Sequence, residues 1–275
     1  MFKILAFDLD GTALNSEKRV TARTGAAITR AIDLGIIAIP CTGREVKGIP
    51  EDVLAIPGIE YLIANNGAQV VSMPERRNIY TRTIDKSAAI ATVLECRELN
   101  AFLFASMASL GYLDTKCEIR NDKAVWSRAR QHFKSWNIPT ADLFEYISAS
   151  DDPIYKFALV IVNEKEHKII WDRLYGRPGI DLTSSGENNI EIMSPGTSKG
   201  AALKYICSRL GVDLKDVMAV GDNLNDIEMI EEAGYSVAMG NSAAKLAELA
   251  DSVTLGCDDD GLAIAIERII LNENI

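Results

Sequence analysis

Short apolar runs alternate with amphipathic stretches over the first 70 residues of the chain. Phe2–Phe7 is apolar enough for a buried parallel strand, and Ile36–Pro40 and Tyr61–Ala64 are two further runs of this kind. Between the first two runs, Thr21 is a typical N-cap for a helix that stops at Gly35. Strands that alternate with helices predict right-handed crossovers and a parallel sheet.

The same alternation returns after residue 195. Helical periodicity over Ser198–Leu210 ends at Gly211, and Val217–Val220 then forms an apolar run. A second helix is expected over Asp226–Ala233, followed by a strand over Tyr235–Met239. The two ends of the chain therefore predict two halves of one sheet.

The segment between the two halves has a mixed character. Strand-like runs such as Tyr155–Val162 and Ile190–Met193 occur among helix-like runs around residues 86–98, 123–136 and 164–175. We expect an α/β protein with a doubly wound, parallel, Rossmann-like core sheet formed by residues 1–82 and 190–275. Residues 83–189 are expected to form an inserted α+β cap domain.

Charge and composition narrow the possible partners. The 275 residues carry a net charge of −10, which disfavours nucleic acid as a partner because its binding needs Lys and Arg on the phosphates. No apolar run approaches the roughly 20 residues that span a bilayer. The five cysteines form no C-x-x-C pair and read as reduced thiols. The sequence thus predicts a cytoplasmic protein without membrane or nucleic-acid partners, and leaves its oligomeric state open.

The first chemical motif is Asp8-Leu9-Asp10-Gly11-Thr12, directly after the first apolar run. Residues two apart on an extended chain face the same way, so both carboxylates point to one place. Close carboxylates resist joint ionisation unless a cation lies between them or one of them keeps a proton. This pattern favours one metal-bound anion as nucleophile and one proton carrier.

Two weaker signals follow other predicted elements. Thr42-Gly43-Arg44 comes after the second apolar run, where a hydroxyl and backbone N–H groups can cradle a phosphate. Lys199 lies in the first turn of a predicted helix, where a positive charge opposes the helix dipole. An anion bound at that point would explain its position.

The last motif is Gly221-Asp222-Asn223-Leu224-Asn225-Asp226, after the strand predicted at 217–220. Its carboxylate and amide oxygens are ligands of the type that Mg²⁺ takes. Ligands of doubly wound sheets bind beyond the carboxyl ends of the strands, where all of these loops are expected to meet.

The order and placement of these motifs resemble the haloacid dehalogenase-like hydrolase superfamily over the whole chain. The large insertion between Asn65-Asn66-Gly67-Ala68 and Glu191-Ile192 looks like the cap of its Cof-type sugar-phosphatase branch. The resemblance implies a Mg²⁺-dependent phosphatase that hydrolyses small phosphorylated metabolites through an aspartyl-phosphate intermediate. An acid at position 10 argues against a haloacid substrate, since dehalogenases of the superfamily have none there.

The resemblance also implies roles for the residues that match these motifs. Asp8 is expected to be the nucleophile and Asp10 the acid and base, and the metal is expected to be held by Asp8, the backbone carbonyl of Asp10, and Asp222. Asp226 would support the metal shell. The residues expected to bind the transferring phosphoryl group are Thr42, Gly43, Lys199 and Asn225.

Substrate specificity is expected to depend on the cap, with Arg44, Asn66 and Lys156 as candidate contacts. Two other functions stay open at this point. A phosphomutase of the phosphomannomutase type needs a cationic clamp in the cap, for which Arg128 and Arg130 are the nearest candidates. A non-catalytic sugar-phosphate-binding protein would be expected to have lost part of the catalytic set, yet every expected position is occupied.

Overall fold

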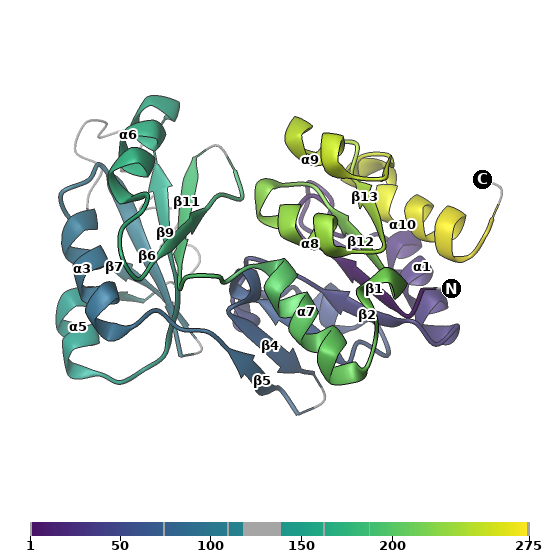
Figure 1. The fold of residues 1–275 in the computed structure, drawn as a ribbon, viewed down its shortest axis with the longest axis horizontal. Coiled ribbons are helices and arrows are strands. Elements are labelled where there is room, and N and C mark those ends of the chain that lie inside the picture. Colours follow the sequence, from purple (N-terminus) through teal and green to yellow (C-terminus); the bar gives the residue numbers. More distant parts are fainter. Residues whose placement is uncertain are drawn as a thin grey trace. The chain divides into compact units, whose positions relative to one another are not determined.

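The structure is a computed structural model that describes residues 2–73, 75–108, 110–117, 139–161, 163–186 and 188–273. The chain divides into two compact units, one formed by residues 1–81 and 198–275 and the other by residues 82–197 (Figure 1). The first unit contains a five-stranded and a three-stranded sheet and the second a six-stranded sheet, and each unit has its own buried apolar residues.

A five-stranded sheet with the order β14-β13-β12-β1-β2 lies at the centre of the first unit. All four neighbouring pairs are parallel. The strands are β1 (Ile4–Phe7), β2 (Ile37–Pro40), β12 (Val217–Gly221), β13 (Tyr235–Ala238) and β14 (Ser252–Val253). The expected parallel core sheet, built from both ends of the chain, is therefore confirmed.

A small antiparallel sheet adjoins β2 in the first unit. A parallel bridge between Cys41 and Ile63 connects β2 to β3 (Tyr61–Ala64). From there β3 pairs with β4 (Gln69–Ser72), and β4 pairs with β5 (Arg77–Thr81). The sequence predicted β3 but not the two strands that follow it.

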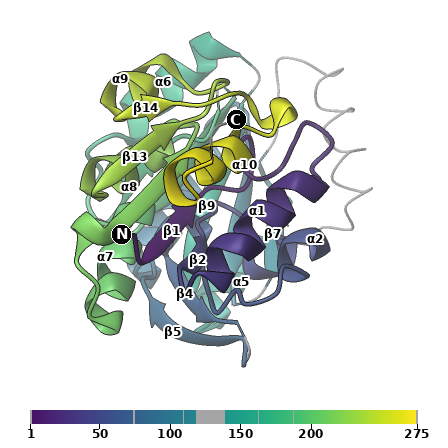
Figure 2. The same cartoon turned by 90° about the vertical axis from the view of Figure 1, so that its right-hand side faces the viewer.

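Helices cover both faces of the parallel sheet. Figure 2 shows α1 and α10 together on one face, while α7 and α8 pack on the other. The α-helices of this unit are α1 (Ala22–Asp33), α2 (Glu51–Leu54), α7 (Lys199–Leu210), α8 (Ile227–Glu232), α9 (Ala244–Leu249) and α10 (Gly261–Ala265). Its shorter turns are η1 (Val46–Gly48), η2 (Asn65–Gly67), η3 (Leu214–Asp216), η4 (Leu224–Asp226), η5 (Cys257–Asp259) and the π-helical η6 (Ile266–Ile270).

The apolar run of β1 explains why the sheet is covered twice. Leu5 and Phe7 pack with the residues of α1 and α10, and Ile4 and Ala6 pack with those of α7 and α8. Since successive side chains of a strand point to opposite faces, a strand that is apolar at every position is buried on both sides. All four residues of β1 are fully buried.

Helix ends follow the capping chemistry of the sequence. The side chain of Thr21 accepts a hydrogen bond from the backbone N–H of Thr24 at 3.1 Å, which fixes the start of α1. Ser198 caps α7 in the same way, through the N–H of Ala201 at 2.9 Å. Gly211, with a φ of +67°, ends α7 in the left-handed conformation.

The second unit contains a six-stranded sheet with the order β10-β11-β9-β6-β7-β8. Its neighbouring pairs are antiparallel except for β7 and β8. The strands are β6 (Ala101–Met107), β7 (Leu110–Asp114), β8 (Thr140–Ala141), β9 (Ile154–Ile161), β10 (Asp181–Thr183) and β11 (Asn189–Met193). The described helices α3 (Lys86–Cys96), α5 (Leu143–Ala149) and α6 (Glu164–Leu174) pack on this sheet through one apolar cluster.

The second unit ends later in the chain than the expected boundary at residue 190. That position lies inside β11, which pairs with β9 on one side and β10 on the other. A strand bonded on both sides stays with its sheet, so this unit continues to Thr197. The helix expected around residues 123–136 lies outside the described residues.

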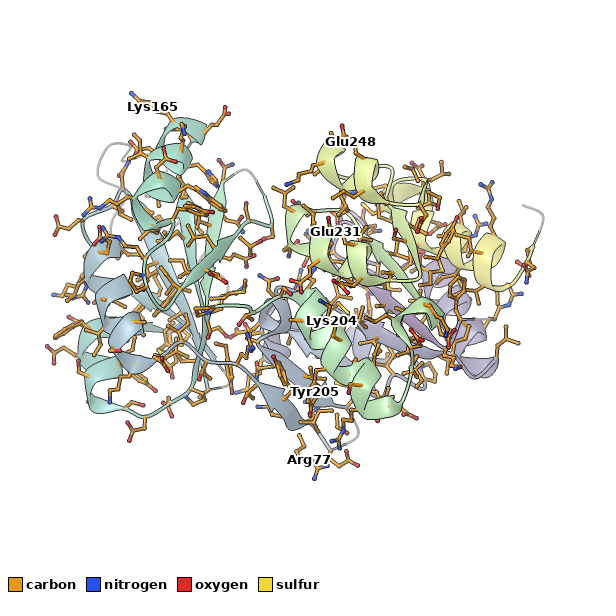
Figure 3. The ribbon with its side chains drawn as sticks, in the orientation of Figure 1. Arg77, Lys165, Lys204, Tyr205, Glu231 and Glu248 are labelled. Carbon is orange, nitrogen blue, oxygen red and sulfur yellow. The ribbon has the colours of Figure 1, made fainter. Side chains whose placement is uncertain are left out.

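Charged side chains extend from the outer faces of the helices, as Lys165, Glu231 and Glu248 do in Figure 3. Tyr205 of α7 instead donates its hydroxyl to the backbone oxygen of Ile79 at 2.8 Å and ties α7 to β5. Within the described ranges, no helix is both long enough and apolar enough to cross a membrane.

A buried ion pair connects three elements of the second unit. Asp114, at the end of β7, accepts hydrogen bonds from Arg97 at 3.0 and 3.1 Å and from the backbone N–H of Leu143 at 3.2 Å. Arg97 also binds Asp142, the N-cap of α5, at 2.5 Å. The side chain of Asp114 has no exposed surface.

We expect Asp114→Ala to lower the free energy of unfolding of the second unit by about 1–3 kcal/mol, because it removes one of the two carboxylates that bind Arg97 and takes the acceptor from the backbone N–H of Leu143. Urea unfolding followed by tryptophan fluorescence measures this, since all three tryptophans lie between residues 82 and 197. Asp151→Ala is the matched control: Asp151 is fully exposed, so its pair with Lys86 at the surface is worth less than about 1 kcal/mol. Equal losses in the two variants would contradict the prediction.

Candidate active site

Three loops of the first unit meet at the carboxyl edge of its parallel sheet. Phe7 of β1 lies opposite Val220 of β12 and opposite Pro40 of β2. The residues that follow these strands therefore start side by side, about 4.8 Å apart from strand to strand. This register brings the first motif, the T-G-R motif and the last motif to one place.

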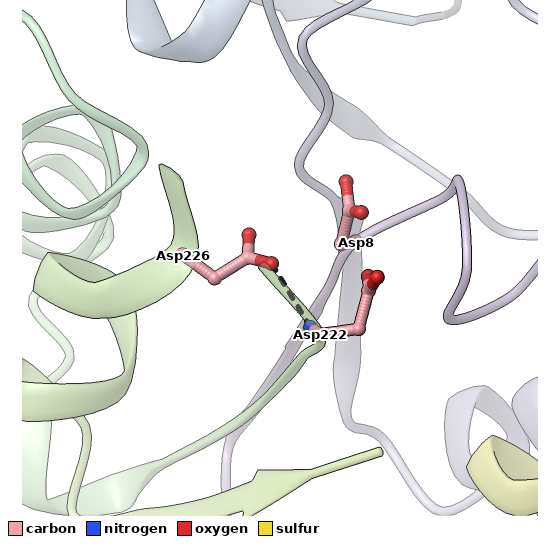
Figure 4. A group of neighbouring side chains, drawn as sticks. All are labelled: Asp8, Asp222 and Asp226. Atoms are coloured by element: carbon pink, nitrogen blue, oxygen red, sulfur yellow. Dashed lines mark hydrogen bonds between the residues drawn. The ribbon is translucent and has the colours of Figure 1, made fainter. Parts of the chain in front are cut away.

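Three carboxylates form the centre of this edge. Asp8, Asp222 and Asp226 are all buried, and each offers an oxygen that lies within 4.8 Å of the oxygens offered by the other two. Figure 4 shows the carboxylates of Asp8 and Asp222 side by side and that of Asp226 turned toward the backbone of Asp222. Asp8 and Asp222 are therefore close enough to share one cation.

Lys199 supplies the positive charge of this cluster. Its Nζ lies 2.7 Å from Oδ1 of Asp8 and 2.6 Å from Oδ1 of Asp226, and the side chain is fully buried. Burial lowers the pKa of this ammonium, but the charges of Asp226 and Asp8 outweigh it and raise the pKa above its ordinary value. Lys199 is thus a permanent cation that fixes two of the three carboxylates.

Asp226 has both of its oxygens engaged. Oδ1 binds Lys199, and Oδ2 accepts the backbone N–H groups of Asp222 and Asn223 at 3.0 and 3.1 Å. These bonds shape the turn that carries Asp222 after β12. The geometry of Asp226 therefore fits a supporting role beside the metal position better than a direct ligand role.

The charges of the cluster do not balance. Three carboxylates face one ammonium, so two negative charges stay uncompensated when all are ionised. Burial raises the pKa of Asp8 well above its ordinary value, against the charge of Lys199 and aided by Asp226 and Asp222. Burial and then the charge of Asp226 raise the pKa of Asp222 to about 6. A divalent cation would remove this imbalance.

The donor set of the cluster fits such an ion. It consists of oxygens, which hard cations such as Mg²⁺ take. In addition, Oδ1 of Asn225 is buried and has no hydrogen-bond partner among the described residues, while its Nδ2 donates to Oδ1 of Asn66 at 3.0 Å. A buried acceptor without a partner costs free energy unless a donor or a cation meets it.

Gly11 and Thr12 hold Asp222 in place. A Cβ on Gly11, whose φ is +83°, would lie 2.4 Å from Oδ2 of Asp222, so no other residue fits there without movement. The hydroxyl of Thr12 donates to Oδ1 of Asp222 at 2.9 Å. No separate role for Thr12 was predicted from the sequence. Its place at the end of the D-x-D-G-T motif was the available signal.

Asp10 is held by two cations. Arg44 binds its two oxygens through Nε at 2.6 Å and Nη2 at 2.7 Å, and Nζ of Lys18 lies 3.0 Å from Oδ1. Burial raises the pKa of Asp10, but the hydrogen bond and charge of Arg44, followed by those of Lys18, lower it to about 2. The Arg44 side chain, expected to contact substrate, thus contacts Asp10, and sequence reasoning missed Lys18.

The Asn65-Asn66-Gly67 turn stands between the T-G-R loop and α7. The backbone N–H of Asn66 donates to the backbone oxygen of Thr42 at 3.0 Å. The hydroxyl of Thr42 accepts the backbone N–H of Arg44 at 3.1 Å, and Gly43 lies between them at the surface of the turn. A Cβ on Gly67, at a φ of +93°, would lie 1.9 Å from the backbone oxygen of Ser198, so glycine permits the contact with the start of α7.

Some expected site residues are not part of this cluster. Lys156 lies on β9 of the second unit, where it pairs with the buried Glu191. Its contact with substrate stays a prediction. Arg128 and Arg130, the candidates for a mutase clamp, lie outside the described residues.

Comparisons with known proteins show which family the chain resembles over its length. The model of a family described as haloacid dehalogenase-like hydrolase matches residues 5–266. Two proteins of Bacillus subtilis are similar over 98% of the chain: 5-amino-6-(5-phospho-D-ribitylamino)uracil phosphatase YwtE at 30% identity, covered to 98%, and phosphatase YwpJ at 32% identity, covered to 100%. A solved haloacid dehalogenase-like hydrolase from B. subtilis matches with a TM-score of 0.82 and 30% identity, over 97% of this chain and 99% of that one.

The raised pKa of Asp222 gives a testable stability effect. Because its folded value of about 6 exceeds the ordinary value of 3.8, Asp222 costs the metal-free fold stability at neutral pH, and this cost disappears as the pH falls from about 6 to about 4. We expect Asp222→Asn, in chelator at pH 7.5, to raise the free energy of unfolding by about 1–3 kcal/mol. Added Mg²⁺ should stabilise the unchanged protein more than the variant.

Chemical denaturation at pH 7.5 and pH 4.5, with and without Mg²⁺, measures both effects. Asp172→Asn, the same change at an exposed carboxylate on α6, is the control and should alter stability by less than about 1 kcal/mol at either pH. An Asp222→Asn variant that is less stable than the unchanged protein in chelator at pH 7.5 would contradict the charge imbalance.

Proposed function

We propose that this chain, which belongs to the haloacid dehalogenase-like hydrolase family and is a phosphatase of that family, hydrolyses small phosphate monoesters. The proposed reaction uses Mg²⁺ and passes through a phosphorylated Asp8. The observation that supports this most is the cluster of Asp8, Asp222 and Lys199 at one edge of the sheet. A carboxylate fixed beside a permanent cation and a set of oxygen atoms that could bind a metal is suited to attack on phosphorus.

Asp8 is the proposed nucleophile because of how it is held. Its backbone N–H is bonded to the oxygen of Val220 at 3.0 Å, and Lys199 fixes its carboxylate. Burial of Asp8 excludes water from the attacking group. An anion that is oriented and poorly hydrated can attack a phosphoryl group in line without first reorganising its surroundings.

The metal would be held by Asp8, Asp222 and the backbone oxygen of Asp10, with Asp226 in support. When bound, Mg²⁺ would neutralise the excess charge of the cluster and that of the phosphoryl oxygens. The transferring phosphoryl group would also meet the hydroxyl of Thr42, the backbone N–H of Gly43 and the amide of Asn225. Lys199 would act on it through its fixed position at Asp8.

Asp10 is the proposed proton carrier. In this structure it is ionised at neutral pH, since Arg44 and Lys18 hold its pKa at about 2. To protonate the leaving alcohol, Asp10 must first take up a proton from water, which weakens its bonds to Arg44 and Lys18, and must turn one oxygen to the ester oxygen while it stays beside both cations. After the alcohol leaves, the ionised carboxylate can take the proton of the attacking water.

The substrate is proposed to be a sugar phosphate or a related metabolite. One similar protein, YwtE, is named for a phosphorylated ribitylaminouracil, which bears a phosphate on a sugar-alcohol chain. The second unit, with Lys156 on β9, is proposed to set specificity. Cytoplasmic location and the absence of nucleic-acid partners stay predictions.

Asp8→Asn is expected to lower kcat for p-nitrophenyl phosphate by a factor of about 10⁴ or more, because an amide is a poor nucleophile. Release of p-nitrophenolate measures the loss, and a thermal unfolding scan checks that the variant is folded. The control Asp216→Asn changes a carboxylate near the opposite end of β1, where it pairs with Lys3, and should keep full activity. Activity retained in Asp8→Asn would disprove the mechanism.

Asp10→Asn is expected to slow the second half of the reaction more than the first when p-nitrophenyl phosphate is the substrate. The good leaving group needs little protonation, whereas the attacking water has lost its base. Stopped-flow measurements should show a burst of about one p-nitrophenolate per active site, followed by turnover about 10²–10⁴ times slower than normal. Normal steady-state turnover would remove Asp10 from its role.

Phosphate-release assays with mannose and glucose phosphates separate the phosphatase from a phosphomutase. A phosphatase releases phosphate and forms no isomeric sugar phosphate. Isomer formation without phosphate release would favour the mutase instead.

A further inference from the structure

Lys18 lies on a turn that is held in one shape by the residues around it. The carbonyl and side-chain oxygens of Asn15 accept the backbone N–H groups of Lys18, Glu17 and Arg19 at 2.9, 3.1 and 3.0 Å. Asp258 fixes the same turn by accepting the backbone N–H of Ser16 at 2.8 Å and its hydroxyl at 2.5 Å. Lys18 itself has a φ of +61°, which is uncommon for a residue with a side chain.

This turn places the ammonium of Lys18 beside Asp10, which already pairs with Arg44. Arg44 alone satisfies both oxygens of Asp10 with its fork of donors, so the carboxylate does not need Lys18 for its charge to be paired. Asp10 with Arg44 and Lys18 therefore carries one excess positive charge, in a protein whose net charge is −10. The side chain of Lys18 is 58% exposed, so its ammonium can reach a bound molecule.

The proposed role of Asp10 indicates where this excess positive charge lies relative to a bound substrate. A proton donor must come within about 3 Å of the leaving oxygen. Nζ of Lys18 is 3.0 Å from Oδ1 of Asp10, so it lies near the leaving group rather than near the phosphoryl group. A group attached within one or two carbons of the ester oxygen would come within reach of Lys18 and of those N–H groups of Arg44 that bind neither Asp10 nor the backbone oxygen of Gly48.

We propose that Lys18 and Arg44 form an anion subsite on the leaving-group side, which selects phosphate esters with a carboxylate or second phosphate next to the ester carbon. The inference rests on the proposed role of Asp10. An anionic group bound there compensates the excess positive charge and leaves the Lys18 turn unchanged. A neutral leaving group has no charge to pair with Lys18 and Arg44, so the subsite does not strengthen its binding.

Two probes that differ in this charge and in one methyl group test the proposal: 2-phosphoglycolate and the methyl ester of its carboxylate. The measured quantity is the ratio of their kcat/KM values in phosphate release, with p-nitrophenyl phosphate as a separate substrate. The unchanged enzyme should prefer 2-phosphoglycolate by about tenfold or more. Most of the preference should appear in KM, since an anion held equally before and during the reaction contributes uniform binding.

Lys18→Asn removes the charge with a residue that tolerates a positive φ, and it should lower the ratio about tenfold. Lys18→Arg keeps the charge and should keep the ratio. Lys3→Gln is the matched control, because it removes one positive charge at the opposite end of β1 and should also leave the ratio unchanged.

A ratio near one in the unchanged enzyme, or a ratio unaffected by Lys18→Asn, would overturn the subsite. Failure to hydrolyse either probe while p-nitrophenyl phosphate is hydrolysed would also overturn it, and would leave the proposed phosphatase mechanism standing. Failure with all three substrates in the presence of Mg²⁺ would instead count against the proposed function itself.

Discussion

The buried ammonium of Lys199 is the interaction on which the arrangement of the site depends. An ammonium without exposed surface costs several kcal/mol unless carboxylates meet it, and here Asp8 and Asp226 do so. The three residues come from the end of β1, the start of α7 and the turn η4 after β12. Their pairing therefore ties together loops that lie nearly 200 residues apart, and it leaves Asp222 and one further negative charge to a divalent ion.

Two carboxylates of the same motif end up in opposite electrostatic surroundings. Burial among other acids raises the pKa of Asp8, whereas Arg44 and Lys18 lower that of Asp10. The reaction needs the opposite order, an ionised nucleophile and an acid that holds a proton, so a cation bound at Asp8 and a leaving group bound at Asp10 would have to shift both pKa values. The site therefore has two regions of opposite charge: excess negative charge at Asp8 and Asp222, which would attract a cation, and excess positive charge around Asp10, which would attract an anion. The proposed function and the proposed anion subsite use one region each.

Much of this could be predicted from sequence, because parallel strands place their following loops at one edge. That rule predicted that Asp8 and Asp222 lie close together, and the apolar run of β1 predicted that this strand is buried. The partners of a charged side chain carry no such signal. A lone lysine reads as solvated, so Lys18 was missed, and Lys199 was expected at a phosphate rather than enclosed by acids. In the second unit, β6 and β7 were missed, and β11 belongs to its sheet, which moved the boundary beyond residue 190.

The central claim is that one divalent ion lies between Asp8 and Asp222. Anomalous diffraction from crystals of the protein soaked in Mn²⁺ locates such an ion directly. The account predicts a single strong anomalous peak in the first unit, within coordination distance of carboxylate oxygens of both Asp8 and Asp222. A fully ordered site without any peak at millimolar Mn²⁺, or a peak bound only elsewhere, would contradict it.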